Sequence, residues 1–159
     1  MNYFELFGLP VGFVVDKSEL ARKYFELQKK YHPDFYTQET EHAQSQALEL
    51  SSEVNKALKV LRNPDETIKY VLQLKGFLEE DEKYQLPPDF LMEMMELNEG
   101  LDGDTATQIA GLEKELYAGV EPILNSYREN SSPDAGLLKV KEYYYKKKYL
   151  QRILDRIAG

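Results

Sequence analysis

Apolar residues recur at helical spacing along the first half of the chain, in two series separated by a proline. The first series follows the spacing i, i+4, i+7 and i+11 and consists of Leu20, Tyr24, Leu27 and Tyr31. The second extends the same spacing to i+18 and consists of Ala43, Ala47, Leu50, Val54, Ala57 and Leu61. Asp16 can cap the first helix, and Pro33 and Pro64 end the two helices because proline disfavours α geometry in the residue before it. The pattern predicts an antiparallel helical hairpin, with a short helix over residues 2–7 packed beside it.

A shorter helix is expected over residues 65–74, ending at Gly76, and three more apolar stripes follow it. The stripes consist of Phe90, Met94, Leu97 and Leu101, then of Ile109, Leu112, Leu116, Ile123 and Tyr127, and finally of Val140, Tyr143, Leu150, Leu154 and Ile157. Ser132 is expected to cap the last helix with Pro133 in its first turn, and Pro122 to kink or break the middle helix. With no strand pattern in the sequence, we predict an all-α chain: a first unit over residues 1–76, an acidic linker over 77–88 and a three-helix bundle over 89–159.

The net charge of −8 is unevenly distributed. Residues 77–132 carry 3 basic and 14 acidic side chains, a net charge of −11, whereas residues 133–159 carry 7 basic and 3 acidic side chains. The acidic middle argues against a nucleic-acid partner for the whole chain, because phosphate binding needs a continuous basic surface. The run from Lys139 to Tyr149 mixes basic with aromatic side chains, a pattern that also occurs in RNA-binding proteins. A basic helix that lies against the acidic segment accounts for the same run without a ligand.

The residues that usually carry chemistry are few. The chain contains no cysteine, which excludes disulfides, thiolate nucleophiles and cysteine-ligated metal or iron–sulfur sites. Its only histidines, His32 and His42, are not spaced to share a helix face. We therefore expect no catalytic residue, no metal site and no bound cofactor. The N-terminus lacks the basic start of a signal peptide and no apolar run reaches the roughly 20 residues of a membrane-spanning helix, so a cytoplasmic protein is expected.

The tripeptide His32-Pro33-Asp34 stands between the two helices of the predicted hairpin. Pro33 fixes its own φ, so the flanking imidazole and carboxylate have little conformational freedom. By itself such a tripeptide could equally end one helix and begin a turn. The helix before it carries five basic residues, Lys17, Arg22, Lys23, Lys29 and Lys30.

The segments that surround the tripeptide make it a specific mark of one protein family. They are NYFELFGLP, QKKYHPD, Asn55-Lys56-Ala57, LRNP, Tyr70-Val71-Leu72 before Gly76, and FLMEMMELNE beyond the linker. With these segments the chain resembles, over nearly its whole length, the HscB-type J-domain co-chaperones of iron–sulfur cluster assembly. The resemblance implies that the first unit is a J domain, which binds the nucleotide-binding domain of a DnaK- or HscA-like chaperone and speeds its ATP hydrolysis. The residues implied in that contact are His32, Pro33, Asp34, Arg22, Lys23, Lys29 and Lys30.

Among the basic residues of this helix, Arg22 and Lys29 are favoured for steering the chaperone. They lie opposite the face formed by Leu20, Tyr24 and Leu27, so their charges point away from the expected core. A single lysine on a helix is often no more than a solvated side chain, and that alternative stays open for each of the five.

The helix expected over residues 89–102 has a second apolar face with an acidic rim, formed by Leu91, Met92, Met95, Glu96 and Glu99. Methionine-rich patches are adaptable binding surfaces, although burial against the J domain or against a second copy would explain the same pattern. The resemblance implies that this face, with Tyr144 of the last helix, holds an IscU-type iron–sulfur scaffold protein. Gly103 stands where some relatives carry a further acidic residue, and Tyr143 and Tyr145 are alternatives to Tyr144.

The sequence as a whole predicts a non-catalytic co-chaperone that delivers a scaffold protein to an ATP-driven chaperone. ATP and the iron–sulfur cluster belong to the partners. Two alternatives remain: a general J protein whose bundle takes unfolded clients, and a helical interaction protein that dimerises through Leu91, Met92 and Met95.

Overall fold

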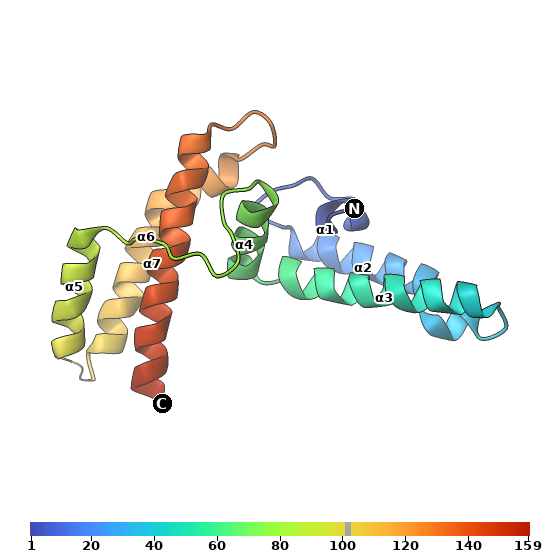
Figure 1. The fold of residues 1–159 in the computed structure, drawn as a ribbon, viewed down its shortest axis with the longest axis horizontal. Coiled ribbons are helices and arrows are strands. Elements are labelled where there is room, and N and C mark those ends of the chain that lie inside the picture. Colours follow the sequence, from blue (N-terminus) through green and yellow to red (C-terminus); the bar gives the residue numbers. More distant parts are fainter. Residues whose placement is uncertain (101–102) are drawn as a thin grey trace. The chain divides into compact units, whose positions relative to one another are not determined.

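The computed structural model describes residues 1–100 and 103–159, and every regular element in these two ranges is a helix (Figure 1). In chain order the elements are α1 (Tyr3–Phe7), α2 (Lys17–Tyr31), the 3-10 helix η1 (Pro33–Tyr36), α3 (Glu41–Leu61), α4 (Pro64–Leu74), α5 (Pro88–Glu99), α6 (Thr105–Ser126) and α7 (Asp134–Ala158). The predicted all-α fold is confirmed. Leu101, which we expected at the end of the apolar stripe of α5, lies outside the described residues.

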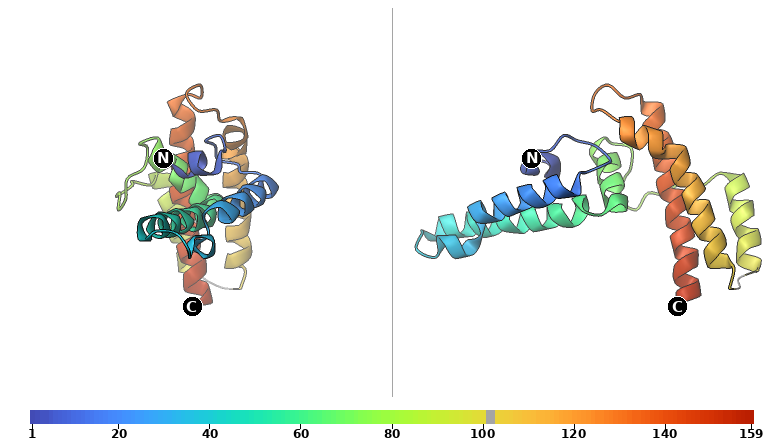
Figure 2. Two further views of the ribbon diagram at one scale, coloured as in Figure 1. Left: turned by 90° about the vertical axis from the view of Figure 1, so that its right-hand side faces the viewer. Right: turned by 180° about the vertical axis from the view of Figure 1, so that it is seen from behind.

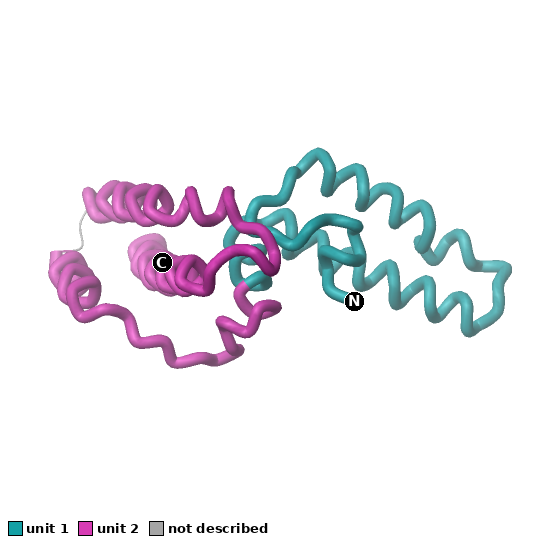
Figure 3. Tube along the Cα trace, turned by 90° about the horizontal axis from the view of Figure 1, so that it is seen from above, with its two compact units in different colours: residues 1–71 teal, residues 72–159 magenta. Residues whose placement is uncertain are grey.

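Contacts divide the chain into unit 1, Met1–Val71, and unit 2, Leu72–Gly159 (Figure 3). Unit 1 is built on the antiparallel pair α2 and α3, which run side by side in the right view of Figure 2, with α1 packed against them. The core of this unit contains aromatic residues from its N-terminal part and aliphatic residues from the hairpin, namely Phe4, Phe7, Phe13, Leu20, Ala47, Val54, Ala57 and Leu61. The predicted hairpin with a short helix beside it is confirmed.

Caps explain where the helices of unit 1 begin and end. The Asp16 carboxylate accepts a hydrogen bond from the Glu19 N–H at 2.9 Å, and the Thr40 hydroxyl accepts one from the Ala43 N–H at 3.1 Å. Each cap satisfies an N–H group that has no partner within its helix. α1 ends at Gly8, whose φ of +66° lies in the left-handed region that glycine adopts without strain.

In unit 2, α5, α6 and α7 form the predicted three-helix bundle. Its core cluster consists of Phe90, Met94, Ile109, Leu150 and Ile153. α6 and α7 pack along one another and approach closely at a glycine, because a Cβ added to Gly136 would lie 3.2 Å from Ile123 Cγ2. The bundle therefore depends on residues from all three helices.

Pro122 was expected to kink or break α6, and it does not break the helix, which continues to Ser126. Pro122 and Ala118 are both exposed, so water can meet the Ala118 carbonyl that loses its helical partner. The expected cap at Ser132 is wrong, because the Ser132 hydroxyl accepts a hydrogen bond from the Arg128 N–H at 2.9 Å and Pro133 itself occupies the N-cap position of α7.

The buried stripes of α6 and α7 are also shifted from the predicted ones. On α7, Ile157 was expected in the core and is 38% exposed, whereas Ile153, one turn earlier, is 2% exposed. On α6, Val120 and Leu124 are buried, while the predicted core residue Ile123 is only half-buried. Ile123 and Leu124 are consecutive and differ by about 100° in direction, so the packing partner decides which of them is buried. Ile153 and Ile157 share one face of α7, so how far the partner helices extend along α7 decides between them.

The acidic segment predicted as a linker, residues 77–88, belongs to unit 2, and its second half lies against α7. The Glu82 carboxylate is 2.6 Å from the Lys141 ammonium, and the ring of Tyr84 stacks on that of Tyr145 with 4.5 Å between centroids. Leu86 packs against the core cluster of the bundle. The contact division after Val71 does not separate a linker, so the boundaries 1–76, 77–88 and 89–159 stay predictions.

Candidate functional site

The tripeptide His32-Pro33-Asp34 follows α2 and begins η1, and we refer to it as the HPD loop. α2 ends at Tyr31, its C-cap His32 is extended with φ −61° and ψ 131°, and Pro33 occupies the first turn of η1. His32 Nδ1 accepts a hydrogen bond from the backbone N–H of Asp34 at 3.2 Å. The Asp34 side chain is 85% exposed, with Oδ2 at 3.6 Å from His32 Nδ1. The loop therefore presents a carboxylate to solvent from a backbone that is restrained on its N-terminal side.

Hydrogen bonds to backbone carbonyls restrain the segments on both sides of the HPD loop. The Tyr36 hydroxyl donates to the carbonyl of Lys30 at 2.7 Å and so connects η1 back to the last turn of α2. The Gln44 side-chain amide donates to the carbonyls of Thr37 and Glu39, at 3.3 and 3.0 Å. These bonds limit the conformations of the chain itself, so the loop is preorganised for a partner.

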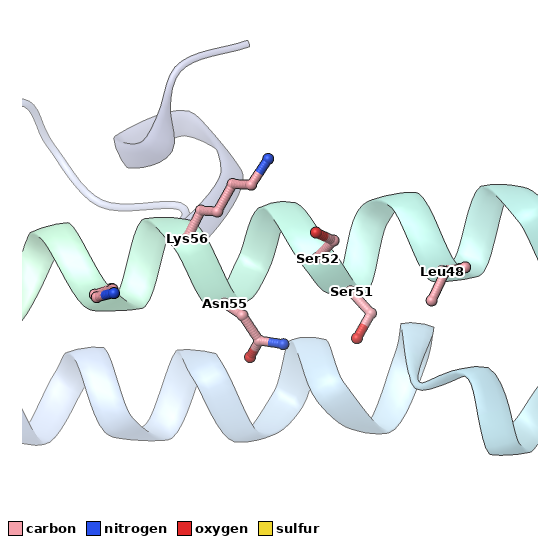
Figure 4. Close-up of a pocket in the computed structure, with 6 residues that line it drawn as sticks. Leu48, Ser51, Ser52, Asn55 and Lys56 are labelled. Carbon is pink, nitrogen blue, oxygen red and sulfur yellow. The ribbon is translucent and has the colours of Figure 1, made fainter.

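A network of hydrogen-bonded polar side chains, which we call the polar seam, joins α2 to α3. Asn55 Oδ1 accepts hydrogen bonds from the Tyr24 hydroxyl at 2.9 Å and from Gln28 Nε2 at 3.1 Å, and the Ser51 hydroxyl donates to Gln28 Oε1 at 3.3 Å. Figure 4 shows Ser51 and Asn55 reaching from α3 toward the neighbouring helix. A hollow of about 340 Å³ along α3 is lined by Leu48, Ser51, Ser52, Asn55, Lys56 and Lys59. We assign it no ligand, because its central polar groups already bond across the seam.

The two favoured cations of α2 differ in how far their charges are compensated. Arg22 lies between Glu19 and Glu26, with N–O distances of 2.6 and 2.7 Å. Its hydrogen bond to Glu19 and the charges of both carboxylates raise the pKa of Arg22 above its usual value. The Lys29 ammonium instead lies over the ring of Phe25, 5.4 Å from the centroid. Because no carboxylate in the described part of the chain is paired with Lys29, its charge is more available to a partner than that of Arg22.

Two exposed phenylalanines beside the HPD loop were not predicted from the sequence. Phe25 is 64% exposed and Phe35 is 65% exposed, and the ring of Phe35 meets that of His32 edge-on at 6.2 Å. Phe25 precedes His32 by two helical turns, so the two residues share one side of α2. The signal in the sequence is that Phe25 interrupts the polar face of this helix.

The outer face of α5 carries the residues expected to hold a scaffold protein, Leu91, Met92, Met95, Glu96 and Glu99. Met92 and Met95 are 64% and 61% exposed, and Leu91 is half-buried. The opposite side of the helix is buried, with Phe90 at 7% and Met94 at 0% exposure. Within unit 2, the core thus uses one side of α5 and leaves two methionines in solvent beside the exposed Glu96 and Glu99.

The three consecutive tyrosines of α7 have different surroundings. Tyr143 belongs to the buried side of the helix, at 5% exposure, and Tyr145 stacks on Tyr84 with an angle of 7° between the rings. Tyr144 is half-exposed. Its ring meets that of Tyr145 edge-on with 5.2 Å between centroids, and its centroid lies 5.9 Å from the Lys148 ammonium. Tyr144 is therefore the one that lies neither in the core nor in the stack with Tyr84.

In the part of the chain that the structure describes, no three His, Cys, Asp or Glu side chains gather as a metal site. Over the same residues, no helix is long and apolar enough to cross a membrane. Unit 1 presents an exposed carboxylate on a restrained loop, and unit 2 presents an apolar face with an acidic rim.

Comparison with known proteins matches both units to described families. Residues 2–70 match the family described as DnaJ domain, and residues 86–158 match the family described as HSCB C-terminal oligomerisation domain. In an alignment of 172 positions that covers 100% of both proteins, the chain is 31% identical to the "Co-chaperone protein HscB homolog" of Vibrio cholerae. The structure superposes on that of human co-chaperone protein HscB with a TM-score of 0.80 at 27% identity, covering 99% of this chain and 81% of the human one. For chaperone HscB from Vibrio cholerae the TM-score is 0.67 at 28% identity, covering 99% and 96% of the two chains.

Proposed function

This chain belongs to the HscB family of J-domain co-chaperones, and from that membership we propose that it delivers an IscU-type iron–sulfur scaffold protein to a DnaK- or HscA-type chaperone. In this proposal unit 1 stimulates the ATP hydrolysis of the chaperone and unit 2 holds the scaffold. The chain contributes no catalytic group, because ATP and the cluster are bound by the partners. The observation that carries the proposal is the 85% exposed carboxylate of Asp34 on a restrained HPD loop, in a chain that matches the family over its whole length.

Unit 1 offers the chaperone three kinds of contact within α2 and the loop after it. Asp34 suits an arginine of the partner, because a carboxylate can accept two parallel hydrogen bonds from a guanidinium group. Lys29, with Lys23 and Lys30, adds positive charge that speeds association with an acidic surface. The exposed rings of Phe25 and Phe35 add apolar area, which charged contacts lack and which anchors most protein interfaces.

Unit 2 supports scaffold binding through the outer face of α5. Met92 and Met95 provide flexible apolar side chains, and Glu96 and Glu99 provide charges at the rim that orient a partner with basic residues. On α7, Tyr144 is the member of the tyrosine triplet whose surroundings favour an interface, because its ring lies outside both the core and the Tyr84 stack. In this proposal the outer face of α5 and Tyr144 contact one folded partner.

The sequence of events in this mechanism follows from having both surfaces on one chain. The scaffold binds unit 2 first, and unit 1 then docks on the ATP-bound chaperone. The effective concentration of scaffold at the chaperone rises because the two are now linked through one molecule. Hydrolysis, stimulated by the J domain, leaves the scaffold in the tight-binding state of the chaperone. We further propose that the protein works in the cytoplasm, where ATP for the chaperone is present.

Two rival functions can be separated from this one. A general J protein would accept unfolded clients, whereas the outer face of α5 is small, helical and acid-rimmed, which suits a folded partner. A protein that dimerises through Leu91, Met92 and Met95 would show twice the chain mass in light scattering at micromolar concentration. Monomers in that measurement would remove the dimer hypothesis.

The experiment that tests the proposed function is a single-turnover ATPase assay. A DnaK-type and an HscA-type chaperone are each mixed with the full chain, with and without an IscU-type scaffold. We expect the chain alone to stimulate hydrolysis by at least one of the two chaperones, and the scaffold to increase that stimulation further. An unfolded client in place of the scaffold should give no such increase. No stimulation of either chaperone would contradict the proposal.

A further inference from the structure

A groove in unit 2 runs between residues 82–86 and α7. Its volume is about 220 Å³, and its lining residues are Glu82, Lys83, Tyr84, Leu86, Tyr145, Lys148, Tyr149 and Arg152. Both walls are anchored, since Leu86 packs against the core cluster and Tyr84 stacks on Tyr145. None of the residues assigned above to the chaperone or to the scaffold lines this groove, so its chemistry needs an explanation of its own.

The groove is cationic although the protein is acidic. Lys83, Lys148 and Arg152 are exposed, and none of them forms an ion pair with a carboxylate of the described residues. The single acidic residue of the lining, Glu82, is already paired with Lys141 at 2.6 Å. Hydrogen bonding to Lys141 lowers the pKa of Glu82, so this carboxylate stays ionised and committed to that partner. Lys148 also lies over the ring of Tyr144, 5.9 Å from its centroid, but a ring carries no formal charge that would neutralise the ammonium. Three uncompensated positive charges therefore line the groove.

The tyrosines give the groove apolar surface together with hydrogen-bond donors. Tyrosine hydroxyls are protonated at neutral pH and can donate hydrogen bonds, and burial raises the pKa of Tyr84 and of Tyr145 further. The Lys141 ammonium lies 5.6 Å from the centroid of the Tyr84 ring, on the segment that forms one wall. A groove that is lined by two stacked rings and by exposed cations suits a ligand that carries carboxylates beside apolar side chains.

We propose that this groove binds an acidic peptide segment of a protein partner, with its carboxylates on Lys83, Lys148 and Arg152 and an apolar side chain against the tyrosines. A guanidinium group at Arg152 can bind a carboxylate through two parallel hydrogen bonds. A short peptide fits better than a polynucleotide, because it can place a few carboxylates on the cations and an apolar side chain on the tyrosines. A polynucleotide carries its charges along a continuous backbone and would extend over residues 77–132, whose net charge is −11. This site is additional to the proposed function and does not depend on it.

The test is a titration of the full chain with a capped peptide of about twelve residues made of Asp, Glu and Leu, followed by calorimetry and by NMR. A matched peptide with Asn and Gln in place of the acids reports on charge. The groove variant is Lys148→Gln with Arg152→Gln, and the control is Lys139→Gln with Arg156→Gln, which removes two exposed charges of the same helix outside the groove. Lys83→Gln, on the opposite wall, is an independent second variant.

We expect the acidic peptide to shift the amide signals of Tyr84 and Tyr145, and the uncharged peptide to bind at least about tenfold more weakly. The groove variant should weaken binding about tenfold and the control less than about twofold, at unchanged melting temperature, because the substituted side chains are exposed. Absence of binding overturns the proposal, as does an equal loss in both variants, which would indicate unspecific attraction. Equally tight binding of an RNA oligonucleotide of the same charge would replace the acidic peptide with nucleic acid as the ligand.

Discussion

The hydroxyl of Tyr24 donates a hydrogen bond of 2.9 Å to the side-chain oxygen of Asn55, and Gln28 donates to the same oxygen at 3.1 Å. One atom of α3 therefore binds two successive turns of α2. Because these two helices carry the HPD loop between them, Asn55 helps to fix the geometry from which Asp34 is presented.

Replacing Asn55 tests this seam. Asn55→Ala should lower the free energy of unfolding by about 1 kcal/mol, because two donors lose their acceptor at a site that water still reaches. Urea denaturation followed by circular dichroism measures this change. Lys56→Ala is the matched control, since Lys56 is exposed and contacts only Glu53 by an ion pair, and should stay within about 0.5 kcal/mol of the unmodified chain. An Asn55→Ala chain as stable as the control would show that the seam does not stabilise the hairpin.

Asp34→Asn should abolish stimulation of the chaperone's ATPase and leave the fold intact. The substitution removes the charge that a partner arginine would bind, but keeps the backbone N–H that donates to His32. Single-turnover ATPase rates and circular dichroism measure the two properties. Glu39→Gln, an exposed carboxylate later in the same connection, is the control and should retain stimulation. Full stimulation by a folded Asp34→Asn chain would discard the J-domain mechanism for this protein.

Salt and charge substitutions on α2 should reveal electrostatic steering. Association with the chaperone should slow between low and physiological ionic strength, because exposed charges are screened beyond about 10 Å in 0.1 M salt. Lys29→Gln should reduce the association rate more than Arg22→Gln, since the charge of Arg22 is offset by Glu19 and Glu26. Stopped-flow measurement of both variants gives the comparison. A rate indifferent to salt would mean that these side chains are only solvated surface.

The outer face of α5 is tested by changing Leu91, Met92 and Met95 together to Ala. The two exposed methionines should cost little stability, within about 0.5 kcal/mol each, and the half-buried Leu91 somewhat more. Scaffold affinity, measured by calorimetry, should fall by a large factor because apolar anchors dominate interface energies. ATPase stimulation by the chain without scaffold should not change.

The control for that triple variant is Met94→Ala on the buried side of the same helix. Met94 is 0% exposed, so its truncation should destabilise unit 2 by roughly 2–5 kcal/mol. A triple variant that melts as early as Met94→Ala would assign the outer face to packing. A stable triple variant with normal scaffold affinity would move the scaffold site elsewhere.

The ion pair between Glu82 and Lys141 predicts a pH dependence of stability. Because pairing lowers the pKa of Glu82 in the folded chain, the pair stabilises the fold above the unfolded pKa of about 4.3, and this contribution is lost as the pH falls through the folded pKa. Glu82→Gln should therefore lower the free energy of unfolding by about 1 kcal/mol at pH 7, and the difference should shrink below about pH 4. Denaturation at both pH values measures it, with the exposed Glu80→Gln as the control. A difference that does not change with pH would contradict the pairing.

The sequence by itself determined the features that depend on neighbours along the chain. The apolar spacing of α2 and α3, the cap at Asp16 and the stop at Pro33 are local, because helix periodicity and backbone restrictions act within a few residues. The exposure of Asp34 follows from the same restrictions. The family could be recognised for the same reason, since its motifs are short segments in a fixed order.

Only the tertiary structure decided the features that depend on which surfaces meet. It placed Ile153 rather than Ile157 in the core of the bundle, because two apolar positions one turn apart are equivalent until a partner helix covers one of them. It likewise separated Tyr143, Tyr144 and Tyr145, whose roles depend on the core and on Tyr84, a residue about sixty positions away in the chain. For the groove beside α7, the charge pattern indicated that the basic helix lies against the acidic segment, in agreement with the ion pair between Glu82 and Lys141. Only the tertiary structure showed that residues 82–86 pack on this helix beside Tyr145.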